Sequence, residues 1–131
     1  MSLSRDGGTV AATVLVAEDN EAVRELVRLA LEGTGLRVLV AGTAAEALEA
    51  AARRWIDVLV ADVILPDGTG PDLAAALRDD NPGLGIVYVS GWHDEPGFPD
   101  VGDGLLLKKP FSLDALRAAV TSLVGADARR R

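Results

Sequence analysis

Three acidic residues stand where two apolar segments of the chain end. Residues 13–17 run directly into Glu18 and Asp19, and residues 56–61 run directly into Asp62. In an open parallel α/β sheet, ligands bind in the crevice outside the carboxyl ends of the strands. Carboxylates that gather in such a crevice repel one another unless a cation joins them. The pattern predicts a Mg²⁺ site with a spare, reactive aspartate, although Glu18 and Asp19 taken alone could simply cap a helix.

The acids are of the type that Mg²⁺ prefers, because this hard cation is bound by oxygen atoms, usually one or two carboxylates with water and phosphate. We expect Asp19 and Asp62 to bind the ion directly and Glu18 to bind it through water. A backbone carbonyl just beyond Asp62 could supply another oxygen, and Ile64 is the candidate.

Two further polar residues, Ser90 and Lys109, follow later apolar segments. A carboxylate such as Asp62 can attack phosphorus and form an aspartyl phosphate, and phosphoryl transfer needs mainly positioning and charge stabilisation. We expect Lys109 to place a positive charge on the phosphoryl oxygens and Ser90 to donate a hydrogen bond to one of them. Lys108 is the alternative by a shift of register, and Lys109 is favoured because it directly precedes Pro110.

Strands and helices alternate between these residues, which indicates an α/β fold with a doubly wound parallel sheet flanked by helices. We expect strands at 13–17, 36–41, 56–61, 86–89 and 105–107, and helices at 21–32, 43–53, 71–80 and 112–124. A flavodoxin-like strand order of 2-1-3-4-5 would make the two acid clusters neighbours. The interval 91–104 contains Pro96, Pro99 and several glycines, so we expect its helix, the fourth, to be short or irregular.

Composition limits the classes of function. The chain has 131 residues and no cysteine, which excludes disulfides and thiolate metal sites. Its net charge of −7 argues against a nucleic-acid-binding surface. No apolar run approaches the ~20 residues that span a bilayer, so we expect a cytoplasmic protein without a membrane contact. We expect one domain at residues 9–125, with a disordered leader at 1–8 and a flexible tail at 126–131.

With these residues in place, the sequence resembles the receiver domain of two-component response regulators from about residue 13 to residue 124. Four segments carry the resemblance, in order and each at an expected strand end: VLVAEDN at 14–20, VLVADVILPDG at 58–68, VYVSG at 87–91 and LLKKPF at 106–111.

The resemblance implies a role for each site residue. It implies phosphorylation at Asp62, Mg²⁺ bound by Glu18, Asp19, Asp62 and the carbonyl of Ile64, and switch or phosphoryl-binding roles for Ser90 and Lys109. A cis peptide bond before Pro110 is implied as well. The partner would be a histidine kinase or a histidine phosphotransfer protein, and a weak homodimer is left open.

Two features differ from many members of that family. Leu106 stands where many receivers carry Tyr or Phe, so we do not expect an aromatic rotamer switch. The irregular interval 91–104 replaces the usual fourth-helix surface, and both features look most like the receivers of hybrid sensor histidine kinases. We expect Trp92 and Ile64 to cover the pocket and give a long-lived phosphoryl group, and we expect His93 to be exposed.

Three other functions compete with phosphoryl transfer. A pseudo-receiver would bind Mg²⁺ or a protein partner without being phosphorylated. A flavodoxin-like cofactor binder would need a Ser/Thr/Gly-rich loop after the first strand, where residues 18–21 read Glu-Asp-Asn-Glu. A Mg²⁺-dependent hydrolase would need an acid–base carboxylate two residues after Asp62, where Ile64 stands. We therefore expect a module that catalyses its own phosphorylation and is not an independent enzyme.

Overall fold

Five parallel strands form the central sheet. The computed structural model describes residues 2–3, 9–91 and 97–130. In spatial order, the strands of the sheet are β4 (Arg37–Ala41), β3 (Thr13–Ala17), β5 (Val58–Asp62), β8 (Gly85–Ser90) and β9 (Leu105–Lys108). In chain order these are the second, first, third, fourth and fifth strands that the sequence predicts, so the expected fold class and strand order are confirmed.

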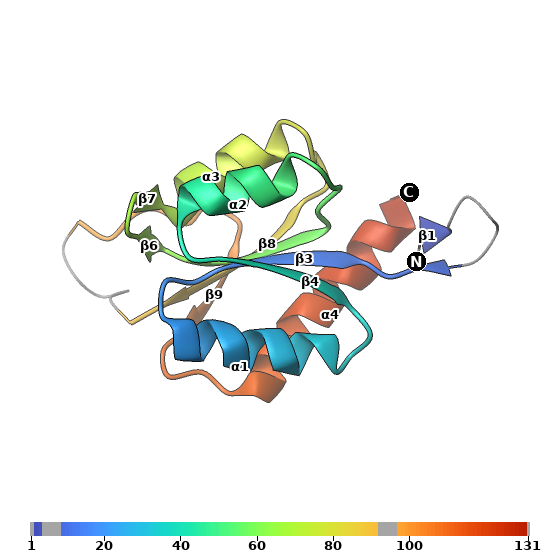
Figure 1. The fold of residues 1–131 in the computed structure, drawn as a ribbon, viewed down its shortest axis with the longest axis horizontal. Helices are drawn as coiled ribbons and strands as arrows, with labels where there is room; N and C mark the ends of the chain where they lie inside the picture. Colours follow the sequence, from blue (N-terminus) through green and yellow to red (C-terminus); the bar gives the residue numbers. More distant parts are fainter. Residues whose placement is uncertain (1, 4–8, 92–96, 131) are drawn as a thin grey trace.

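Helices cover both faces of the sheet (Figure 1). On one face lie α1 (Glu21–Glu32) and α4 (Leu113–Arg130), and on the other lie α2 (Ala44–Ala51) and α3 (Gly70–Arg78). Alternate residues of β3 and β5 enter one of two separate cores, one beneath each helix pair. Every residue of these two strands is buried, which explains why both read as continuous apolar runs.

A capping side chain stands at the start of each of the four described helices. Four side-chain oxygens accept the backbone N–H three residues later, and they belong to Asn20, Thr43, Thr69 and Ser112. The predicted caps at Thr43 and Ser112 are confirmed. Asn20, and neither of the two acids before it, caps α1, so capping does not account for the acidic pair.

A short hairpin connects β5 to α3. Its strands are β6 (Ile64–Leu65) and β7 (Gly68–Thr69), which pair antiparallel around a turn at Pro66 and Asp67. The sequence predicts this turn, and the hairpin places the segment after Asp62 against the start of α3. Residues 97–104 form no helix, in agreement with an irregular fourth helix, whereas Trp92, His93 and Pro96 lie outside the described residues.

Secondary structure is present near both chain ends. Ser2–Leu3 (β1) pairs antiparallel with Thr9–Val10 (β2), and residues 4–8 lie outside the described residues. Helix α4 continues to Arg130, six residues beyond the end near Val124 that the sequence predicts. None of the described helices combines the length and the apolar character that a membrane crossing demands.

Candidate functional site

The register of the sheet places Glu18 and Asp62 side by side. Strands β3 and β5 are neighbours, and their last paired residues are Ala17 and Ala61. The next residue on each strand is an acid, so both acids reach the carboxyl end of the sheet at the same level. Their side chains are buried, with 2% of Glu18 and 5% of Asp62 exposed. The expected meeting of the two acid clusters is confirmed.

Asp19 completes a group of three carboxylates. One oxygen each of Glu18, Asp19 and Asp62 lies within 4.8 Å of the other two. Asp19 is exposed whereas its two companions are buried, so the group opens to solvent on one side. The backbone also fixes the Glu18 side chain, because its Oε2 accepts the Asn20 backbone N–H at 3.0 Å.

The Lys109 ammonium lies among the buried carboxylates. Its Nζ is 2.9 Å from Glu18 Oε1 and 2.8 Å from Asp62 Oδ1. The backbone N–H of Lys109 donates to the Ser90 carbonyl at 2.9 Å, and the following Lys109–Pro110 bond is cis, as expected. Lys108 is exposed, so Lys109 is the lysine that the fold brings to the acids.

Ser90 and Ile64 lie at the same edge of the sheet. Ser90 ends β8, one residue beyond the pairing of Val89 with Asp62, and its side chain is buried. Ile64 begins β6 two residues after Asp62, and half of it is exposed. The predicted cover residue Trp92 lies outside the described residues, and Leu106 pairs with Tyr88 on the neighbouring strand.

Burial and close charges set the protonation of the site. Burial opposes ionisation of Glu18, yet hydrogen bonds with Asp62, the Asn20 N–H and Lys109 outweigh it and lower the pKa of Glu18 to about 2. Burial, followed by the hydrogen bond with Glu18, raises the pKa of Asp62 to about 8 in spite of Lys109. Burial also favours a neutral Lys109, but hydrogen bonds with Asp62 and Glu18 raise its pKa. At neutral pH, Asp62 therefore keeps a proton that it shares with Glu18.

The donor set fits a divalent cation. The Lys109 ammonium contacts two of the three carboxylates, so the group carries excess negative charge, which adds to burial in favouring a protonated Asp62. The atoms that converge are carboxylate oxygens, which are the ligands that Mg²⁺ prefers. A bound Mg²⁺ would replace the shared proton as the counter-charge.

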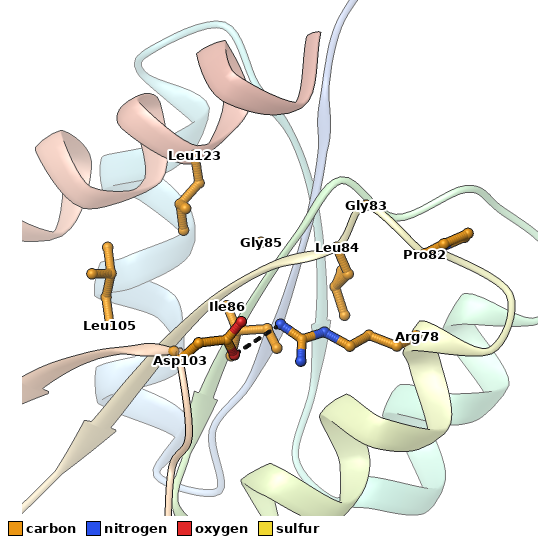
Figure 2. A pocket seen from close by; sticks show the side chains of 10 residues that line it. Arg78, Pro82, Gly83, Leu84, Gly85, Ile86, Asp103, Leu105 and Leu123 are labelled. Carbon is orange, nitrogen blue, oxygen red and sulfur yellow. Dashed lines mark hydrogen bonds and ion pairs between the residues drawn. The ribbon is translucent and has the colours of Figure 1, made fainter. Parts of the chain in front are cut away.

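A cavity at the other end of the sheet carries none of this chemistry. It has a volume of about 460 Å³ and lies beside the start of β8 and the end of α3 (Figure 2). Its charged residues, Arg78 and Asp103, form an ion pair at 3.2 Å, and the side chains of Leu84, Ile86 and Leu123 line the rest. The acidic group at the opposite end of the strands therefore remains the candidate site.

Sequence reasoning missed two residues that support the site. Arg24 donates from Nη1 to the Glu18 carbonyl at 3.0 Å, and Asp67 accepts two N–H groups at the start of α2. A basic residue close to a helix start is unfavourable for the helix dipole, so the position of Arg24 is itself a signal of another role. Asp67 offered no such signal, since aspartate is an ordinary turn residue.

Comparison with known proteins agrees with this geometry. The family model for the response regulator receiver domain matches residues 14–121. The probable transcriptional regulatory protein TcrX of Mycobacterium tuberculosis is 34% identical over 115 residues, which are 86% of this chain and 49% of TcrX. The sensor kinase CckA of Brucella abortus is 35% identical over 118 residues, which are 86% of this chain and 12% of the kinase.

A solved structure shows the same fold. The CheY-like response regulator receiver domain protein of Methanospirillum hungatei superposes with a TM-score of 0.83 at 22% identity, over 93% of this chain and all of that one. The chain spans about half the length of TcrX and a small part of CckA. By its sequence match and its fold, the chain belongs to the response regulator receiver domain family of two-component systems.

Proposed function

We propose that this receiver domain takes a phosphoryl group from a phosphohistidine onto Asp62, in a reaction that depends on Mg²⁺. Receiver domains generally bind Mg²⁺, are phosphorylated and interact with histidine kinases. The observation that carries the proposal is the convergence of the Glu18, Asp19 and Asp62 oxygens, with the Lys109 ammonium against the two buried acids.

Asp62 is the nucleophile in this proposal. An ionised oxygen of Asp62 attacks phosphorus, a P–O bond forms as the P–N bond breaks, and the imidazole nitrogen keeps the electron pair. Because the pKa of Asp62 is raised to about 8, its carboxyl group must first lose its proton. Lys109, at 2.8 Å, favours the ionised form and then lies beside the new phosphoryl group.

The remaining site residues hold the ion and the phosphoryl oxygens. Glu18, Asp19, Asp62 and the Ile64 carbonyl would hold Mg²⁺. When bound, the ion supplies positive charge that offsets the carboxylates and the phosphoryl oxygens. Ser90, buried at the end of β8, would donate its hydroxyl group to a phosphoryl oxygen.

A histidine kinase or a histidine phosphotransfer protein is the proposed donor. The net charge of −7 supports a protein partner over a nucleic acid for this domain. Residues 9–125 are the proposed functional unit, and they contain the matched range 14–121. No described observation favours a flavin or a hydrolase reaction, because acids occupy the loop after β3 and Ile64 follows Asp62 by two residues.

Intact-mass spectrometry after treatment with acetyl phosphate tests the proposal. The wild type should gain one phosphoryl group with Mg²⁺ and none after chelation, and Asp62→Asn should gain none. Asp57→Asn is the matched control, because Asp57 is a buried aspartate that directly precedes the first residue of the same strand. This control should be labelled like the wild type.

Two results would contradict the proposal. Labelling that persists in Asp62→Asn would contradict the site assignment. A wild type that binds Mg²⁺ but is labelled neither by acetyl phosphate nor by a phosphorylated histidine kinase would be a pseudo-receiver.

A further inference from the structure

The β6–β7 hairpin carries Ile64, the residue proposed to give Mg²⁺ a backbone oxygen. The hairpin has only two residues on each strand, with Ile64 opposite Thr69 and Leu65 opposite Gly68. A two-stranded ribbon is marginally stable by itself. The position of Ile64 relative to the carboxylates therefore depends on what holds the two ends of the hairpin.

The base of the hairpin is fixed to the sheet. The Val63 N–H donates to the Val89 carbonyl at 3.1 Å, and the Gly70 N–H donates to the Val63 carbonyl at 2.7 Å. Gly70 lies so close that a Cβ there would be 2.5 Å from the Asp62 carbonyl oxygen. These contacts hold the residues next to Asp62 but do not reach the turn.

The turn is fixed by Asp67 to a different element. Asp67 Oδ1 accepts the Ala44 N–H at 2.7 Å, and Oδ2 accepts the Ala45 N–H at 3.0 Å. These are the first two residues of α2, whose N–H groups have no partner within the helix. Both bonds lower the pKa of Asp67. Helix α2 also has its own cap, because Thr43 Oγ1 accepts the Glu46 N–H.

The Asp67 contact closes a ring around the acidic site. Helix α2 follows β4 after two residues, and the last residue of β4, Ala41, accepts the Glu18 backbone N–H at 3.0 Å. One path from Glu18 to Asp62 crosses the β3–β5 pairing. The other runs from Glu18 through Ala41, the start of α2 and Asp67 to the hairpin that carries Ile64. Without Asp67 the turn of the hairpin loses its two hydrogen bonds to α2.

We propose that Asp67 is a positioning residue for the Mg²⁺ site, and that it holds the β6–β7 turn so that Ile64 keeps its place relative to Glu18 and Asp62. This inference rests on the proposed function. Mg²⁺ demands near-ideal octahedral geometry, so its affinity is sensitive to a displaced ligand. Outer groups that orient metal ligands typically change metal affinity about 10–100-fold when they are removed.

Isothermal titration with MgCl2 tests the proposal on the whole chain. The variants are Asp67→Ala, which opens the ring, and Thr43→Ala, which removes the other cap of the same helix and leaves the ring closed. Asp67→Ala should raise the Kd for Mg²⁺ about tenfold and still be labelled on Asp62 at saturating Mg²⁺. Thr43→Ala should lower the unfolding temperature and leave the Kd unchanged.

Each result has a definite meaning. If Asp67→Ala keeps the wild-type Kd, or if Thr43→Ala raises the Kd as much, then Asp67 acts only as a helix cap and the inference is wrong. Asp67 is exposed, so Asp67→Ala should remain folded, and a thermal melt without Mg²⁺ checks this. A wild type that fails to bind Mg²⁺ would instead overturn the proposed function, and this inference with it.

Discussion

The two ends of the central sheet both bury polar side chains, but they treat them in opposite ways. At the amino end, each polar group meets the backbone. Asp57 Oδ2 accepts the Thr13 N–H at 2.8 Å, Asn81 Oδ1 accepts the Ile56 N–H at 2.9 Å, and Asn81 Nδ2 donates to the Leu77 carbonyl at 2.9 Å. Hydrogen bonds of this kind between side chains and the backbone lock neighbouring segments together.

At the carboxyl end, acids face acids. Glu18 and Asp62 lie together and share one close ammonium, that of Lys109, and Asp19 adds a third carboxylate at the exposed side. Burial first, and then the neighbouring Glu18, raises the pKa of Asp62. The amino end is therefore organised for stability, whereas the carboxyl end keeps unbalanced charge that a cation can neutralise.

The largest effect on stability is expected at the amino end. Asn81→Ala should lower the free energy of unfolding by about 2 kcal/mol, because it leaves the Ile56 N–H without its partner and removes the side-chain bond to the Leu77 carbonyl. Urea denaturation measures this. Asp19→Ala is the control at the carboxyl end, and as an exposed substitution it should change stability by no more than about 0.5 kcal/mol. Equal losses in the two variants would remove the distinction between the ends.

An effect that is smaller per pH unit should appear in the dependence of stability on pH without Mg²⁺. The pKa of Asp62 rises on folding from 3.8 to about 8, so the folded state binds the extra proton and stability falls as pH rises through this window. The slope is at most about 1.4 kcal/mol per pH unit. The pKa of Glu18 falls from 4.5 to about 2, so its contribution is lost as pH decreases through that range. From these two groups, stability should be highest near pH 4.

Urea denaturation between pH 2 and pH 9 measures this curve. Asp62→Asn has no carboxyl group to titrate, so the fall in stability from pH 5 to pH 8 should disappear in this variant. A wild-type curve that stays flat or rises over that range would show that Asp62 is ionised without a metal.

Much of the fold could be predicted because its signals are local. Apolar runs that are buried on both faces mark β3 and β5, and Thr43 and Ser112 mark helix starts. The strand order follows once βα units alternate, and it brings Glu18 and Asp62 together. The sequence predicts an end of α4 near Val124, which is too early, because the charged final turns of the helix resemble a solvated tail.

The support of the site could not be predicted because it depends on long-range contacts. Asp67 reaches a helix start 22 and 23 residues away, and no local pattern in the sequence marks that bond. The choice between Lys108 and Lys109, in contrast, could be made from the sequence, because Lys109 directly precedes Pro110, and the fold places Lys109 at the acids. The protonation of Asp62 needs the distance between the acids, and spacing along the chain does not supply it.

The most direct test of the central claim is the free energy of unfolding at pH 8 with and without saturating MgCl2. The wild type should be stabilised by the ion, since a ligand that binds only the folded state raises stability by RT ln(1 + [L]/Kd). Asp62→Asn should be the more stable of the two without Mg²⁺ and should gain much less from the ion, whereas Asp57→Asn should respond to it as the wild type does. The claim is that the carboxylates at the carboxyl end of the sheet form a Mg²⁺ site. A wild type whose stability does not change with Mg²⁺, or an Asp62→Asn variant that Mg²⁺ stabilises as much as the wild type, would contradict it.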